Sequence, residues 1–161
     1  MKRIIALSLA AIMMIAVFAG CGSDKKESSD KSVTAASVLT EINKQYPDAV
    51  GKFTEIKDKS DLKRYYSIDE SKVVDFAGEI NSKDALEIVI IKGKDSDARA
   101  DIESKLTIRY NSLLSQYASY DADRLKMAKA CGVTEVGDEY AVLVLAENYD
   151  DIKSLIEDKL G

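Results

Sequence analysis

Leu86-Glu87-Ile88-Val89-Ile90-Ile91 and Tyr140-Ala141-Val142-Leu143-Val144-Leu145 are the two stretches that decide the fold. Both runs are rich in β-branched residues and both end at polar ones, which predicts well-buried strands. A weaker strand is predicted before each of them, near residues 74–80 and near residues 131–136. Gly137-Asp138 is typical of a hairpin turn, so the second pair of strands is predicted to be a hairpin.

A helix is predicted after each pair of strands. Asp95 stands before the first helix and Asn148 before the second, and acidic residues follow within the first turn, where free backbone N–H groups and the helix dipole favour them. Apolar residues recur at helical spacing in both segments. They are Ala98, Ile102, Leu106, Leu113 and Tyr117 in the first helix, and Ile152, Leu155, Ile156 and Leu160 in the second.

These elements form a repeat. Residues 73–106 align without a gap onto residues 127–160, which places Gly78 on Gly132 and Asp84 on Asp138. We interpret the match as a duplicated strand-strand-helix unit. A chance match between two amphipathic segments with similar helix starts is the alternative, and the strand and helix predictions do not depend on which is right.

The segment before the repeat is predicted to be helical. Ala35, Val38, Leu39 and Ile42 recur at helical spacing, and Tyr46-Pro47 ends the helix because the residue before proline avoids the helical conformation. A helical turn capped by Ser60 is predicted over residues 60–66, and a short helix capped by Asp121 over residues 120–127. The predicted fold class is α+β: an N-terminal helix, then the duplicated unit forming a four-stranded, mainly antiparallel sheet with both long helices packed on one face.

The N-terminus has the order of a secretory signal. Lys2 and Arg3 are followed by an apolar run, which is shorter than the roughly 20 residues of a spanning helix, and then by small residues. Phe18-Ala19-Gly20-Cys21 resembles the lipobox of bacterial lipoproteins, with Phe18 in the usual leucine place. The resemblance implies a signal peptide over residues 1–20 that is cut before Cys21, and lipid attached to the Cys21 thiol. An ordinary secretory signal or an uncleaved anchor is the alternative.

The rest of the chain divides into a tether and one domain. Residues 22–32 contain no apolar residue to bury, so residues 21–32 are predicted to be a lipidated cysteine and a disordered tether that spans roughly 17–20 Å. Residues 33–161 suffice for a single domain. Cys131 then has no cysteine partner, and its apolar surroundings indicate an inert buried thiol rather than a reactive one.

Composition excludes several classes of function. The chain carries a net charge of −5 and loses two basic residues with the signal, so it is a poor nucleic-acid binder and is attached to the membrane by lipid rather than by charge. It contains no histidine, which excludes Ser-His-Asp triads and histidine-based zinc sites. No phosphate loop or dinucleotide motif is present, and paired acids such as Asp95 and Asp97 are explained by helix capping. We therefore predict no metal and no cofactor.

A family resemblance rests on hydrophobic runs and tyrosines over residues 33–161. Tyr65-Tyr66-Ser67-Ile68-Asp69, the run from Leu86 to Ile91, Tyr117 to Tyr120, and Gly137 to Val144 together resemble the family known as domain of unknown function 4358. Ser67 stands where that family has glycine. The resemblance implies a small lipoprotein with the same order of tail and domain, and it implies no activity.

The sequence supports two hypotheses about function. The first is a non-enzymatic binding or interaction module on the outer face of the cell membrane, with an envelope protein, a peptide or a glycan as partner. The second is a carboxylate- and tyrosine-based hydrolase or transferase, which a deep pocket with converging Asp69, Arg109 or Tyr120 would favour. Tyrosine rings suit core packing or a contact surface. The candidate ligand surface consists of Tyr66, Asp69, Arg109, Tyr117 and Tyr120.

Overall fold

The computed structural model describes residues 33–161 of the chain, and the predictions for the signal, Cys21 and the tether lie outside these residues. The N-terminal half contains one α-helix, a two-residue strand, a second α-helix, a 3-10 turn and a hairpin. A long helix, a short helix, a second hairpin and a last helix follow. In order the elements are α1 Ala35–Gln45, β1 Thr54–Glu55, α2 Lys59–Tyr66, η1 Glu70–Lys72, β2 Val73–Asn81, β3 Leu86–Gly93, α3 Ser96–Tyr120, α4 Ala122–Ala128, β4 Gly132–Val136, β5 Tyr140–Leu145 and α5 Tyr149–Leu160.

The strands form one antiparallel sheet in the order β1-β2-β3-β5-β4. The two predicted apolar runs are its central pair, with Ile90 opposite Val142. The prediction of an α+β fold is confirmed, but the prediction of four strands was wrong, because β1 adds a fifth strand beside Glu79 and Ile80. A two-residue strand leaves no alternating pattern in the sequence, so β1 could not be predicted from it.

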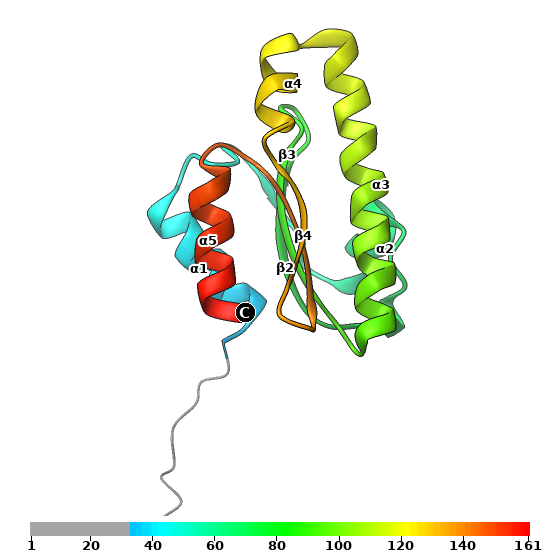
Figure 1. Ribbon diagram of the computed structural model, residues 1–161. Helices are drawn as coiled ribbons and strands as arrows, with labels where there is room; N and C mark the ends of the chain where they lie inside the picture. The colour runs from blue at the N-terminus through cyan, green and yellow to red at the C-terminus, as the bar shows by residue number, and fades with distance from the viewer. Residues whose placement is uncertain (1–32) are drawn as a thin grey trace, which may run out of the picture.

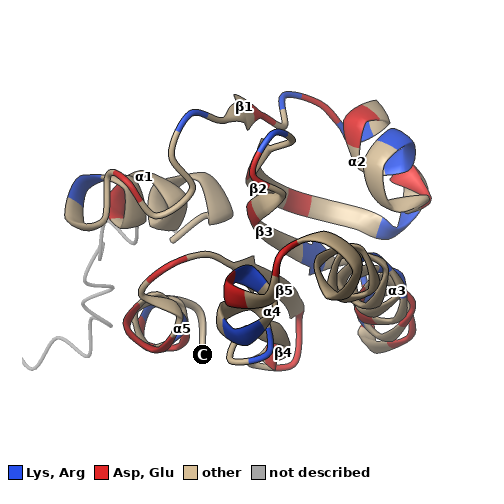
Figure 2. Cartoon of the chain, turned by 90° about the horizontal axis from the view of Figure 1, so that it is seen from above, with Lys and Arg blue, Asp and Glu red and all other residues tan. Residues whose placement is uncertain are grey.

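The sheet is covered by helices on both faces (Figure 1). Alternate side chains of a strand point to opposite faces, so Val89 and Ile91 pack in the cluster with α3, while Ile88 and Ile90 pack in the cluster with α1 and α5. Seen from above, the sheet lies between the layer of α1 and α5 and the layer of α2 and α3 (Figure 2). The core therefore has two layers that share one sheet.

The prediction that both long helices lie on one face was wrong. The order strand-strand-helix does occur twice, and the aligned residues Val89 and Leu143 both face α3. The helices nevertheless diverge, because α3 covers that face and α5 packs with Ile152 and Ile156 on the other. The physical reason is that β3 and β5 are apolar on both faces, so a second covering layer is required, and α5 supplies it together with α1.

Two predicted helix starts also differ from the structure. Asp58, not Ser60, caps α2, because its carboxylate accepts the backbone N–H groups of Ser60 and Asp61. Asn148 precedes α5 but makes no side-chain capping bond; it adopts a left-handed conformation with φ of 62°, which asparagine tolerates at the turn out of β5. Asp121 caps α4 as predicted.

None of the helices within residues 33–161 combines the length and the apolar character that crossing a bilayer requires.

Candidate functional site

Two of the predicted site residues meet inside the core at Glu87. This carboxylate is 0% exposed and lies on β3, facing α3. Arg109 of α3 donates to both of its oxygens at 3.1–3.3 Å, and the Tyr66 hydroxyl lies 3.4 Å from Oε2. Burial raises the pKa of Glu87, and the hydrogen bonds and charge of Arg109 oppose that rise. The pKa of Tyr66 is raised well above its ordinary value, first by burial and then by the Glu87 charge.

This arrangement is a structural ion pair rather than a ligand site. Arg109 and Tyr66 supply the partners of Glu87, which lies within the core cluster under α3. An enclosed carboxylate of this kind is kept charged only by its paired cation. The pair therefore fixes α2 and α3 against β3.

The other predicted site residues do not join this group. Tyr117 is buried and its hydroxyl donates to the carbonyl oxygen of Ala85 at 2.6 Å, with the carbonyl oxygen of Asp84 3.1 Å away, which ties α3 to the β2–β3 hairpin. Asp69 caps η1, because its carboxylate accepts a hydrogen bond from the Ser71 backbone N–H at 2.9 Å. Tyr120 is 88% exposed at the end of α3. Asp69, Arg109 and Tyr120 thus do not converge on a pocket, and the five residues do not form one exposed surface.

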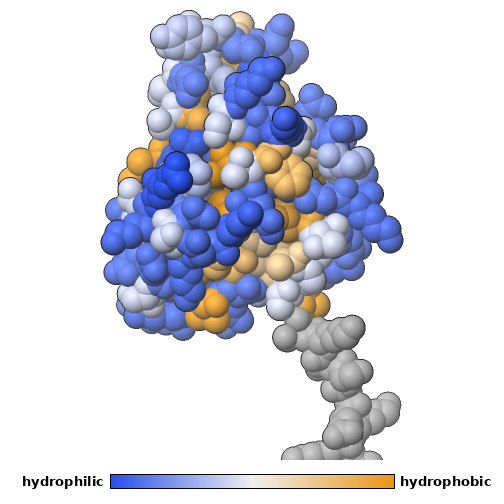
Figure 3. Space-filling view, turned by 180° about the vertical axis from the view of Figure 1, so that it is seen from behind, coloured by the Kyte–Doolittle hydropathy of each residue, from blue (hydrophilic) through white to orange (hydrophobic). Residues whose placement is uncertain are grey.

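A groove that the sequence did not predict lies between α1 and the β1–β2 edge of the sheet. Its volume is about 490 Å³. The space-filling view from behind shows apolar side chains exposed among hydrophilic ones on this side of the molecule (Figure 3). Helix α1 forms one wall, the segment around β1 forms the other, and β2 forms the floor. The lining residues are Ala36, Leu39, Thr40, Asn43, Phe53, Glu55, Ile56, Lys57, Phe76, Ala77, Gly78 and Glu79.

Polar side chains of β2 hold α1 in place above the sheet. Asp75 accepts the backbone N–H of Ala35 at 2.8 Å, at the first turn of the helix, where the helix dipole favours a carboxylate. Glu79, on the same face of the strand, accepts from the Asn43 side-chain amide at 2.8 Å. The groove is therefore built by contacts between distant parts of the chain.

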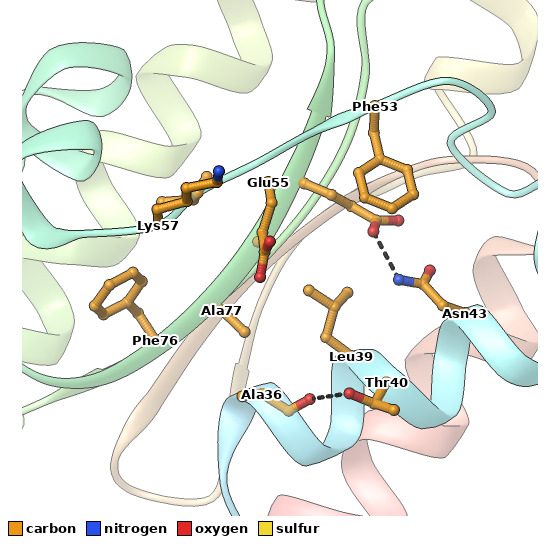
Figure 4. A pocket seen from close by; sticks show the side chains of 12 residues that line it. Ala36, Leu39, Thr40, Asn43, Phe53, Glu55, Lys57, Phe76 and Ala77 are labelled. Atoms are coloured by element: carbon orange, nitrogen blue, oxygen red, sulfur yellow. Dashed lines mark hydrogen bonds between the residues drawn. The ribbon is translucent and has the colours of Figure 1, made fainter.

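The close view shows which groups face the groove (Figure 4). The Glu55 carboxylate points down from β1 into the space above Leu39 of α1, and Phe53 lies toward the same end of the groove as Asn43. Lys57 lies at the far end, near Phe76. Phe53 is 43% exposed, so its ring is accessible from the groove.

The groove carries buried negative charge. Glu79 is only 1% exposed; burial raises its pKa, the Asn43 hydrogen bond opposes that rise, and the Glu55 charge adds to it. Within residues 33–161, neither Glu55 nor Glu79 forms a salt bridge. Glu79 is therefore a buried acid without a cationic partner in the described chain, an arrangement that costs stability and is common at functional sites.

The sequence held one signal that could have located this groove. Asp75, Ala77 and Glu79 alternate along the strand predicted near residues 74–80 and so share one face, and two acids on one face of a strand indicate a place where polar contacts are made. The partner wall could not be found in this way, because Phe53 and Glu55 lie in a stretch without apolar periodicity. Only the tertiary fold brings β1 alongside Glu79.

We expect Glu79→Gln to raise the free energy of unfolding by about 1 kcal/mol near neutral pH. The amide keeps the shape of the side chain and can still accept from Asn43, but it buries no charge. Because the folded pKa of Glu79 is raised, its contribution to stability is present below the unfolded pKa of about 4.3 and is lost as the pH rises through the folded value. Thermal unfolding at several pH values should therefore show a gain that vanishes near about pH 4.

The matched control for this experiment is Glu70→Gln, because Glu70 is exposed on η1, away from the groove. It should leave the unfolding temperature unchanged at every pH. A loss of stability in Glu79→Gln at neutral pH would show that the Glu79 charge is favourable in the folded protein.

The remaining cysteine is buried. Cys131 is 8% exposed, its Sγ lies 3.5 Å from the Ala146 carbonyl oxygen, and burial raises its pKa. A thiol with a raised pKa forms little thiolate at neutral pH, which favours the interpretation of Cys131 as an inert core residue.

In the part of the chain that the structure describes, no three acidic or cysteine side chains gather in an arrangement that could hold a metal ion.

Comparison with known proteins gives one match. The family described as Domain of unknown function (DUF4358) matches residues 48–146, which run from the loop between α1 and β1 to the residue after β5. No functionally curated protein matches the chain. No solved structure matches it either. The fold and the groove are therefore interpreted from this chain's own residues.

Proposed function

Because the chain belongs to the DUF4358 family, whose description names no activity, we propose a function from its own side chains: a lipid-anchored module on the outer face of the cell membrane that binds a ligand without transforming it. The groove between α1 and β2 is the binding site. Attachment is through lipid on Cys21, after removal of residues 1–20. The observation that carries the binding role is the groove itself, in which an exposed Phe53 and a buried Glu79 without a cationic partner among residues 33–161 line one space.

The dimensions and the lining of the groove support this role. A volume of about 490 Å³ lies within the range of small-molecule sites, which are mostly apolar with a few oriented polar groups. Leu39 and Phe53 supply apolar surface, and Glu55, Glu79 and Asn43 supply the polar groups. A histidine is absent from the whole chain, so the commonest general base is not available for catalysis.

A binding screen tests the proposed site. We expect at least one member of a chemically diverse library of small molecules to perturb the NMR signals of groove residues in the full-length protein. Phe53→Ala should lower the affinity for that ligand by about tenfold. An aromatic side chain at the centre of a binding site contributes at least about 1.4 kcal/mol to the free energy of binding. Tyr120→Ala is the control, because Tyr120 is exposed far from the groove lining. A screen in which no library member perturbs the signals of groove residues would overturn the proposal.

The anchor is tested separately from the groove. Cells fed with a fatty-acid probe should label the wild-type protein, and Cys21→Ala should abolish the label and release the protein from the membrane. Cys131→Ala serves as the control and should keep the label. Equal labelling of Cys21→Ala and wild type would overturn the lipid anchor and leave the groove unaffected.

A further inference from the structure

The groove's two carboxylates have no cationic counterpart among the described residues. Glu79 Oε2 accepts one hydrogen bond, from the neutral Asn43 amide, and Oε1 accepts none from residues 33–161. The Glu55 carboxylate points into the same space (Figure 4). Its charge acts unfavourably on Glu79, since the two are opposite each other across the β1–β2 pair. A positive charge between them would relieve this repulsion and pair the buried acid.

The walls around this charge are apolar and aromatic. Phe53 flanks the space from the β1 side, and Leu39 enters it from α1 (Figure 4). Aromatic faces attract cations, and more strongly where water is excluded. Lys57 is the one basic side chain in the lining, and it lies at the end of the groove away from Asn43. The negative end and the apolar middle therefore suit different parts of one ligand.

We propose that the ligand of this groove is a small organic cation, with an ammonium group bound between Glu55 and Glu79 and an apolar body packed against Phe53 and Leu39. This inference rests on the proposed function and names the chemical class of its ligand. A bound metal ion fits less well, because calcium takes six to eight oxygen ligands and the groove offers two carboxylates beside the Phe53 ring. A volume of about 490 Å³ accommodates a small molecule.

Matched charged and neutral probes test this assignment. We would titrate the full-length protein with 2-phenylethylamine, 1-aminohexane and agmatine, and with 2-phenylethanol and 1-hexanol as neutral analogues of the first two, by calorimetry near neutral pH. At least one amine should bind about tenfold more tightly than its alcohol. Glu79→Gln should lower the affinity for that amine about tenfold and leave the affinity for the alcohol unchanged. Phe53→Ala should lower the affinity for both.

The outcomes separate the ligand class from the binding role. Glu70→Gln, an exposed acid outside the groove, should not change the affinity of any probe. If amine and alcohol bind equally and Phe53→Ala weakens both, the cation assignment is wrong and the binding groove stands. Amine binding that is insensitive to both Glu79→Gln and Phe53→Ala would place the amine elsewhere and overturn the assignment. If no amine binds, the assignment is wrong, and the library screen decides the binding role independently.

Discussion

Arg109→Met should lower the free energy of unfolding by about 3–5 kcal/mol, the largest effect that we expect from a single substitution in this chain. Methionine replaces the aliphatic stem of the arginine but leaves Glu87, 0% exposed, without its cation. The Tyr66 hydroxyl at 3.4 Å is then the remaining partner of that carboxylate. Denaturant unfolding followed by circular dichroism measures the loss.

The loss should depend on pH in a defined direction. Without Arg109, the folded pKa of Glu87 rises further, because burial is no longer opposed by the guanidinium. A raised pKa means that the contribution of the group to stability is present below the unfolded value, about 4.3, and is lost as the pH rises through the folded value. The deficit of Arg109→Met should therefore be greatest at neutral pH and should narrow as the pH approaches about 4.

Two further variants make this prediction specific. Arg124→Met removes a comparable ion pair, with Asp84 at 2.7 Å, but both side chains are about one third exposed, so the cost should be about 1 kcal/mol or less. Adding Glu87→Gln to Arg109→Met should recover most of the loss, because no charge stays buried. Equal costs for Arg109→Met and Arg124→Met would contradict the buried-pair interpretation.

Gly93→Ala should lower the free energy of unfolding by about 3 kcal/mol, the second largest effect that we expect. This is at the upper end of the usual loss of stability from overpacking. Gly93 ends β3, where the first turn of α3 passes close to the strand. A Cβ at this position would lie 2.6 Å from the backbone nitrogen of Arg99 and 2.9 Å from its Cα. These are backbone atoms of a helix, so the contact cannot be relieved by rotating a side chain. Thermal unfolding should show the decrease.

Gly132→Ala is the matched control, because Gly132 also belongs to a strand that packs under helices. The nearest atom to its added Cβ is the Tyr149 hydroxyl oxygen at 3.8 Å, which is ordinary van der Waals contact. The substitution should be neutral or should stabilise by up to about 1 kcal/mol, since alanine lowers the entropy of the unfolded chain. A comparable loss in both variants would show that glycine flexibility, not the contact with α3, is what Gly93 provides.

The strands and helices were predictable where the pattern was local. The apolar runs at residues 86–91 and 140–145 are the central strands, and the stripe that includes Ile102, Leu106 and Leu113 is the buried side of α3. The face on which each helix lies was not predictable, because β3 and β5 are apolar on both faces and so accept a helix on either. The face that each helix covers is decided by packing between elements far apart in the chain.

The candidate site shows the same limit. Tyr66, Arg109 and Tyr117 were singled out for their chemistry. In the structure Tyr66 and Tyr117 are buried and Arg109 is half-buried, and Tyr66 and Arg109 share Glu87 as a partner, which the sequence did not identify. The groove, in contrast, depends on Glu79 and Phe53, which meet only because β1 pairs with the edge of β2. A pairing of two residues carries no sequence signature, so its consequences emerge only in three dimensions.

The covering of the second face of the sheet also bears on how the family's boundaries are understood. The matched segment, residues 48–146, includes every strand but excludes α1 and α5, the two helices that pack over Ile88, Ile90 and their neighbours and that are joined by the Lys159–Glu41 ion pair at 3.0 Å. A segment cut at those limits would expose half of its core to water, so the shared region is narrower than the unit that folds. Since α1 also supplies one wall of the groove, relatives that share the sheet need not share the ligand.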